Sequence, residues 1–188
     1  MTANCPTCTQ FSKRQPKEPL HPHNVPSFPW QKLATDLFDH QEAQYLLITD
    51  YYSKYSSVRK LNSTKSAAVI NHLKSVFAEH GKPETLVSDN GPQYSSQEFA
   101  AFCKQWGIEH VTSSPLYLQS NGFKERSVQT VETLLQKAEA SGQDPYLALL
   151  TYPTTPVDNN LPSPATLLNR RDYRTVAVQR TVPTFTRL

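Results

Sequence analysis

The chain has 188 residues, 37% of them hydrophobic and 19% charged, with a formal net charge of +3 at pH 7. This is the composition of a globular chain that can bury a core, and it excludes an intrinsically disordered protein. No apolar run approaches the roughly 18 residues of a membrane span, and the N-terminus lacks the apolar segment of a signal peptide. We therefore expect no membrane partner. The three cysteines then favour a reducing compartment, with metal-binding or packing roles.

Positive charge gathers at the C-terminal end. Residues 161–188 contain five arginines and one aspartate, Asp172, while the rest of the chain is nearly balanced, with 14 basic and 15 acidic residues. A basic tail can follow the phosphates of a nucleic acid, and it can equally be a solvated end. The arginines are Arg170, Arg171, Arg174, Arg180 and Arg187.

Proline dominates the segment before the first expected strand. Residues 16–29, PKEPLHPHNVPSFP, hold five prolines and predict an extended connector without regular structure. Apolar runs at 32–38, 44–52 and 56–61, with polar loops between them, then predict three strands in an antiparallel meander.

The hydrophobic period changes after this meander. Apolar residues at helical spacing predict an amphipathic helix with Ser63 or Thr64 as its N-cap and Gly81 at its end. They are Val69, Leu73, Val76 and Phe77.

The alternation of strands and helices then continues. We expect a short buried strand over 84–89, a helix over 96–107 and a fifth strand over 108–113. A further helix is expected from about 121 to 140. This order predicts an α/β fold, with a five-stranded mixed sheet flanked by helices.

Three acids occupy positions where such a sheet carries functional groups. Asp36 lies in the first strand, and Glu125 lies in the first turns of the last helix. Asp89 ends the fourth strand, directly before an Asn-Gly-Pro turn. A carboxylate at a buried strand end needs a compensating partner, so Asp89 either caps its turn or meets a cation. Glu125 has an ordinary explanation in the favourable field of a helix N-terminus. The 35 residues between Asp89 and Glu125 prove little, because chance gives about one acid pair at any chosen separation.

Four segments together carry a resemblance. ATDLF, LLITDYYSKY, PETLVSDNGPQYSSQEF and SSPLYLQSNGFKERSVQTV resemble, in order and spacing, the catalytic core of retroviral and retrotransposon integrases, above all those of Ty3/gypsy-type elements and the host genes derived from them. The resemblance runs from about Cys5 to Arg174. It implies an RNase H-like fold, and it implies that Asp36, Asp89 and Glu125 are the family's metal-binding triad.

The resemblance also divides the chain. Residues 1–15 become a remnant of an N-terminal zinc-binding unit, 16–29 a proline-rich linker, 30–174 the catalytic core and 175–188 a basic C-terminal tail.

The activity so implied is metal-dependent processing of DNA 3′ ends and their transfer to double-stranded DNA. Two Mg²⁺ or Mn²⁺ ions roughly 3.5–4 Å apart can stabilise both the attacking and the leaving oxygen of a phosphoryl transfer. Hard cations prefer oxygen ligands, and three converging carboxylates without a cation would repel one another. We also expect self-association, because the family needs a multimer to hold two DNA ends. The protein would act in the nucleus, or reside in the cytoplasm before nuclear entry.

The segment before Glu125 is expected to meet the DNA. Residues 113–122 predict a mobile loop loosened by Gly122, and in the family this loop contacts DNA near the active site. The residues so implicated, which are equally ordinary polar loop residues, are Tyr117, Gln119, Asn121 and Lys124. The chain departs from the family at Leu118, where proline is frequent, and at Phe123, where an exposed ring could stack on a base or rest on a neighbouring loop.

The cysteines suggest the trace of a second metal site. Cys5 and Cys8 have the C-x₂-C spacing of half a tetrahedral zinc site. In integrases two histidines precede this pair, but only four residues precede Cys5 here, and His21 and His23 lie too close together among prolines. We expect a remnant without stable zinc.

Several other polar residues are predicted to be structural. The family often has an acid at Asp50 that lies outside the triad. Cys103 is expected to pack inside a helix interface, and the remaining histidines show no ligand spacing and are expected at the surface or in packing: His40, His72, His80 and His110.

Two other functions remain open at this stage. A domesticated integrase-like protein could keep the fold as a catalytically silent DNA-binding or interaction module. An RNase H-like nuclease acting on RNA–DNA hybrids would use similar carboxylates, although the matches around Asp89 and Glu125 disfavour it.

Overall fold

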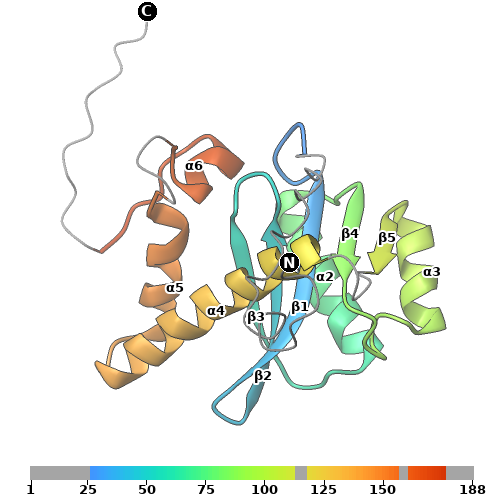
Figure 1. Ribbon diagram of the computed structural model, residues 1–188, viewed down its shortest axis with the longest axis horizontal. Coiled ribbons are helices and arrows are strands. Elements are labelled where there is room, and N and C mark those ends of the chain that lie inside the picture. Colours follow the sequence, from blue (N-terminus) through green and yellow to red (C-terminus); the bar gives the residue numbers. More distant parts are fainter. Residues whose placement is uncertain (1–25, 113–117, 157–160, 177–188) are drawn as a thin grey trace, which may run out of the picture.

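The computed structural model describes residues 26–112, 118–156 and 161–176, which form a mixed sheet with helices on both faces (Figure 1). The spatial order of the strands is β3-β2-β1-β4-β5. The first three strands form the predicted antiparallel meander, and β4 and β5 run parallel to β1. The strands are β1 (Lys32–His40), β2 (Ala43–Asp50), β3 (Ser56–Leu61), β4 (Thr85–Ser88) and β5 (Glu109–Thr112). The predicted five-stranded mixed α/β sheet is confirmed.

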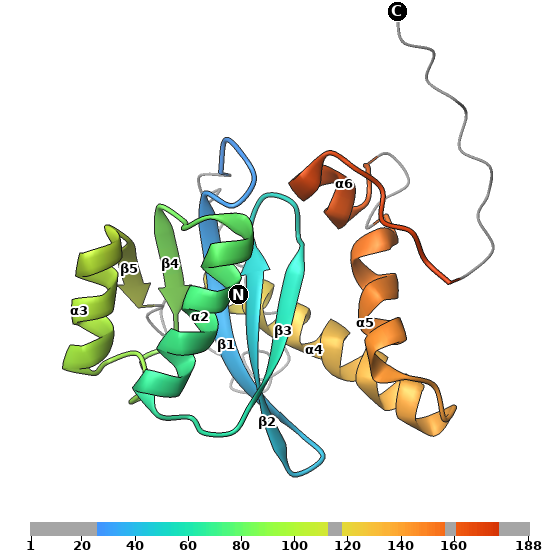
Figure 2. The same cartoon turned by 180° about the vertical axis from the view of Figure 1, so that it is seen from behind.

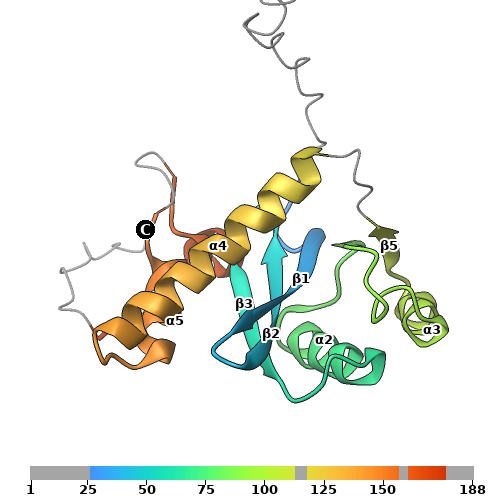
Figure 3. The same cartoon turned by 60° about the horizontal axis from the view of Figure 1, so that its bottom comes forward.

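The helices divide between the two faces of the sheet. Seen from behind, α2 (Ser66–His80) covers the sheet and α3 (Gln97–Trp106) stands beside β5 (Figure 2). On the opposite face α4 (Leu118–Ala140) crosses β1 and β2 (Figure 3). The chain then turns back through α5 (Pro145–Thr154) and α6 (Pro164–Asn169). Among the described residues, no helix is long and apolar enough to cross a membrane.

The side chains of β1 alternate between two hydrophobic cores, one on each face of the sheet. Leu33 packs with residues of α2 and α3 in the larger core, which includes Leu73 and Phe99. Phe38 packs on the other face against Val131 and Leu135 of α4. Because successive side chains of a strand point to opposite faces, Asp36 shares the α4 face with Phe38.

Three details differ from the sequence-based expectation. The N-cap of α2 is Lys65, without a side-chain cap, because Ser63 instead accepts a hydrogen bond from the Lys65 amide in the preceding turn. The last sheet-covering helix begins at Leu118 within the expected loop. Gly122 does not interrupt this helix, because a glycine inside a helix costs only about 1 kcal/mol relative to alanine. Neither α5 nor α6 was expected, because prolines at 145, 153 and 164 obscure them; two of these occupy first helical turns, where proline is tolerated.

Asp50 closes the turn that follows β2. Its carboxylate accepts hydrogen bonds from the Tyr52 amide at 3.2 Å, the Ser53 amide at 2.9 Å and the Ser53 hydroxyl at 2.6 Å. The residue is fully buried, and these donors compensate its lost hydration. The predicted structural role of Asp50 is confirmed.

Replacing this acid tests how much the turn depends on it. Asp50→Ala leaves the buried donors of Tyr52 and Ser53 without an acceptor, so it should lower the free energy of unfolding by about 2–3 kcal/mol in urea denaturation. Asp39→Ala removes an exposed acid near the end of β1 and should change it by less than about 0.5 kcal/mol. Equal effects of the two substitutions would contradict this role for Asp50.

Candidate active site

Asp36 lies in the middle of the central strand, on the face that α4 covers. β1 pairs with β2 through this position, where Asp36 lies opposite Leu47. The side chain is half-buried, and its Oδ1 accepts a hydrogen bond from the Leu37 amide at 3.0 Å. The position of this carboxylate is therefore set by a paired strand.

Asp89 stands directly beyond the end of β4, which is parallel to β1. Its Oδ1 accepts a hydrogen bond from the Gly91 amide at 3.1 Å. Its own carbonyl accepts one from the Ser88 hydroxyl at 2.7 Å. Asp89 therefore does cap its turn, using one carboxylate oxygen, and this does not exclude a role beside a cation.

The third acid comes from α4. Glu125 is exposed, while its neighbour Lys124 is only 5% exposed. Val131 and Leu135 anchor the helix on the sheet, so the two residues are delivered to the Asp36 face by core packing.

The electrostatics of Asp36 show that these groups are neighbours. Burial raises the pKa of the Asp36 carboxyl, and the charges of Asp89 and Glu125 raise it further, while the Lys124 ammonium and the Leu37 amide lower it. The structure thus brings Asp89 and Glu125 within electrostatic reach of Asp36, together with a buried lysine.

The carboxylates of Asp36, Asp89 and Glu125 do not converge on a single point. Within 26–112, 118–156 and 161–176, no group of three or more His, Cys, Asp or Glu side chains is disposed to hold a metal ion. Carboxylates that repel one another have a physical reason to stand apart without a cation. As a donor set, three carboxylates suit a hard divalent ion such as Mg²⁺.

The remaining predicted site residues fall into two groups. Cys5, Cys8 and Tyr117 lie outside the described residues, as does most of the linker. Gln119 and Asn121 lie in the first turn of α4, where only the backbone is described. For these residues the predicted zinc and DNA contacts stay predictions.

Lys124 and Phe123 differ from what their loop position suggested. Lys124 is buried, and its ammonium lowers the pKa of the Asp36 carboxyl. No spacing in the sequence indicated this role. Phe123 is half-buried, with its ring centroid 4.5 Å from that of Tyr51 and the Lys54 ammonium 4.6 Å away. The ring therefore rests on a neighbouring loop, one of the two placements considered for it, and stacking on a base stays a prediction.

Cys103 and His110 have packing roles. Cys103 is buried, and burial raises the pKa of its thiol to about 11. His110 forms a 2.8 Å hydrogen bond with the Ser88 hydroxyl and packs edge-on against Phe99. Burial lowers its pKa, as expected for a neutral packing histidine.

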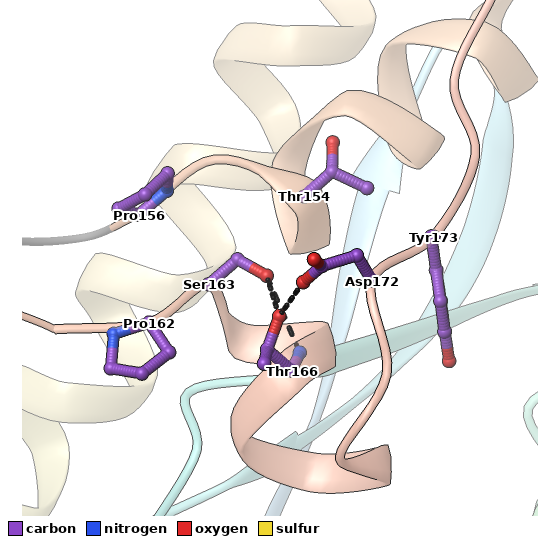
Figure 4. Close-up of a pocket in the computed structure, with 7 residues that line it drawn as sticks. All are labelled: Thr154, Pro156, Pro162, Ser163, Thr166, Asp172 and Tyr173. Carbon is purple, nitrogen blue, oxygen red and sulfur yellow. Dashed lines mark hydrogen bonds between the residues drawn. The ribbon is translucent and has the colours of Figure 1, made fainter. Parts of the chain in front are cut away.

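A hollow of about 220 Å³ lies between α5 and α6 (Figure 4). Asp36, Asp89 and Glu125 are not among the residues that line it. The polar groups on its wall bind one another: Thr166 donates to Asp172 at 2.6 Å, and its hydroxyl pairs with that of Ser163 at 2.8 Å. Ser163 also caps α6. This network holds a short helix in place, and none of the three acids contributes to it.

Removing the Asp36 charge should stabilise the protein in the absence of divalent ions. Burial raises the folded-state pKa of Asp36 above the ordinary value of an aspartate, so folding favours the protonated form, and this contribution is lost as pH rises through the folded pKa. Asp36→Asn cannot ionise, so in EDTA its melting temperature should exceed that of the wild type at pH 7. The difference should shrink below pH 4.

Asp39→Asn, on the same strand but exposed, is the matched control and should show no such pH-dependent gain. A melting temperature of Asp36→Asn below that of the wild type at pH 7 would contradict the electrostatic account of this site.

Comparison with known proteins assigns the fold and the family. The family model for the integrase core domain matches residues 29–117. The uncharacterized protein K02A2.6 of Caenorhabditis elegans is 38% identical over 143 residues, which are 76% of this chain and 11% of that protein. The Pol-related polyprotein of mouse intracisternal A-particle MIA14 is 32% identical over 139 residues, which are 73% of this chain and 16% of the polyprotein. The chain thus spans less than a fifth of the length of these relatives.

Solved structures agree with this assignment. The simian T-cell lymphotropic virus intasome in complex with PP2A regulatory subunit B56 gamma gives a TM-score of 0.74 at 23% identity, over 98% of this chain and 69% of that chain. The HTLV-2 integrase catalytic core domain in complex with magnesium, in its trimeric form, gives 0.63 at 24% identity, over 76% and 98%. At these identities the likeness shows the fold, which confirms the RNase H-like prediction. The family-model match over residues 29–117 and the relatives at 38% and 32% identity show that the chain belongs to the integrase family, as a core domain.

Proposed function

We propose that this protein is a polynucleotidyl transferase that uses divalent metal ions to process DNA 3′ ends and join them to double-stranded DNA. One observation carries the proposal: carboxylates from the end of β4 and from α4 lie close enough to Asp36 on β1 that, beyond the effect of burial, their charges raise its pKa. We further propose that the source is a Ty3/gypsy-type element or a host gene derived from one, on the four matching motifs.

Asp36, Asp89 and Glu125 would hold Mg²⁺ or Mn²⁺. Two such ions, when bound, stabilise charge on the attacking and leaving oxygens of the phosphoryl transfer. The chain supplies the placement, because Asp36 is fixed by strand pairing and Asp89 by its turn. Lys124 lowers the pKa of Asp36 and so favours the ionised carboxylate that a metal requires.

No protein side chain is needed as the nucleophile in this proposal. As in the family it resembles, a water molecule attacks first and a DNA 3′-hydroxyl attacks second. The buried surroundings of Asp36 limit competing hydration of the carboxylate.

The DNA partner is favoured by arginines near α6. Arg170, Arg171 and Arg174 are exposed, and Arg171 lies 4.9 Å over the ring of Tyr173. Asp172, the acid that lies between these arginines in the sequence, accepts a hydrogen bond from the Thr166 hydroxyl. These guanidinium groups are free of Asp172 and could face phosphates, which is one of the two interpretations that the charge of the C-terminal region left open.

The wider setting is proposed on the same basis. A complete reaction on two DNA ends requires several copies of the chain, and it would take place in the nucleus, with residence in the cytoplasm before nuclear entry. Cys5 and Cys8 would be the remnant of a zinc-binding unit.

The decisive experiment is nicking and strand joining on a short DNA duplex with Mg²⁺ or Mn²⁺. Glu125→Gln should reduce both activities by roughly 100-fold or more, because a metal ligand supports several kcal/mol of transition-state stabilisation. Glu132→Gln, two helical turns further along α4, is the matched control and should retain activity.

Other outcomes select the alternatives. If the wild type and Glu125→Gln are equally inert while both are folded and bind duplex DNA, the protein is a catalytically silent DNA-binding module. Preferential cleavage of an RNA–DNA hybrid would instead indicate an RNase H-like nuclease.

The arginine contacts predict a particular salt dependence. The triple variant Arg170→Ala, Arg171→Ala, Arg174→Ala should reduce the slope of log K against log salt for duplex binding by about 2–3, since each phosphate contact contributes about 0.9. The triple variant Lys60→Ala, Lys104→Ala, Lys137→Ala removes the same charge from exposed positions on β3, α3 and α4. An equal loss of slope in both variants would show that only net charge matters.

A further inference from the structure

The ladder between β1 and β4 ends just before the acids. Its last register pair is Ala34 with Val87. Asp36 remains paired with β2, whereas Asp89 already belongs to the loop beyond β4. Strand pairing alone therefore does not fix the separation of Asp36 and Asp89.

Just beyond the end of the β1–β4 ladder, two buried hydroxyl groups join the loop after β4 to β1. The Tyr94 hydroxyl lies 3.1 Å from the Thr35 hydroxyl, and the two residues are 2% and 1% exposed. The ring of Tyr94 is anchored edge-on against Phe99 of α3, with the centroids 5.2 Å apart. The bond thus ties the loop after β4 to β1, one residue from Asp36.

Two hydrogen bonds within the loop connect Tyr94 to Asp89. The Tyr94 amide donates to the Gly91 carbonyl at 3.0 Å, and the Gly91 amide donates to Asp89 Oδ1 at 3.1 Å. A continuous path therefore runs from the carboxylate of Asp89 through Gly91 and Tyr94 to Thr35.

The hydroxyl pair cannot itself be a metal ligand. Thr35 and Asp36 are successive residues of a strand, so their side chains point to opposite faces of the sheet. Burial raises the pKa of the Tyr94 hydroxyl, and the charges of Asp36 and Asp89 raise it further, so the group stays protonated and neutral. Its contribution to the site is positional.

We propose that the Tyr94–Thr35 hydroxyl pair sets the separation of Asp36 and Asp89, which makes Tyr94 a positioning residue for divalent-metal binding. This inference rests on the proposed metal-dependent function. Mg²⁺ demands near-ideal octahedral geometry, whereas Ca²⁺ accepts 6–8 ligands in flexible arrangements. Loosening the separation should therefore weaken Mg²⁺ binding more than Ca²⁺ binding.

Calorimetric titration of the DNA-free protein with Mg²⁺ and with Ca²⁺ tests the inference. Tyr94→Phe and Thr35→Val should each weaken Mg²⁺ binding by about 5- to 10-fold, the effect of losing one hydrogen bond, with a smaller change for Ca²⁺. The double variant should be no weaker than either single variant, because both break the same bond. Thr35→Ser keeps the hydroxyl and should restore wild-type selectivity.

Tyr152→Phe is the matched control. It removes a hydroxyl that donates to the Lys54 carbonyl at 3.2 Å from α5, and it should leave the affinities for both ions unchanged even if stability falls. Thermal melts accompany every titration, so that a general loss of folding is recognised.

Two results would overturn the inference. The first is wild-type Mg²⁺ affinity and selectivity in Tyr94→Phe, and the second is an additive loss in the double variant. If the wild type binds neither ion, the proposed function fails and the positioning role fails with it. Faster hydrogen exchange of residues 89–96 in Tyr94→Phe would then leave the bond as a purely structural tether.

Discussion

A half-buried carboxyl group with two other acids near it is the constraint on which this site depends. Asp36 is half-buried between the sheet and α4, where burial raises its pKa and the charges of Asp89 and Glu125 raise it further. One buried ammonium, that of Lys124, acts in the opposite direction. Burial strengthens every one of these interactions, because the effective dielectric constant is lower there than in water. The surrounding fold must therefore hold together groups that would separate if they were free to move.

Apolar packing on both faces of β1 holds the strand, and with it Asp36, in place. On one face Leu33 belongs to the large core under α2 and α3, and on the other Phe38 packs against Val131 and Leu135 of α4. Burying each such side chain contributes roughly 1.5–3 kcal/mol to the stability of this arrangement. Because α4 carries both its packing residues and Glu125, the same helix supplies stability and charge.

Residue patterns in the sequence were sufficient for the sheet, which follows from local rules, whereas the three acids were selected as a triad by the resemblance to the integrase family. Period-two runs marked the strands, and each acid stood in or beside a regular element. The start of α4 and the whole of α5 were missed because prolines and a glycine mask their helical spacing. The roles of Lys124 and Tyr94 were beyond local rules, since each depends on contacts across the sheet: Tyr94 meets Thr35 at a sequence distance of 59 residues.

Two aspartates with nearly the same local sequence show why the chemistry of a site needs the structure. Asp36 follows Ala-Thr and Asp50 follows Ile-Thr, and both lie in apolar strands. Asp50 is fully buried and accepts three hydrogen bonds from its own turn. Asp36 accepts one from a backbone amide and faces two further acids. A carboxylate whose donors already satisfy it stabilises the fold, whereas one left with like charges gains from a cation. The donors around each acid therefore distinguish a carboxylate that its own turn satisfies from one that a cation would stabilise.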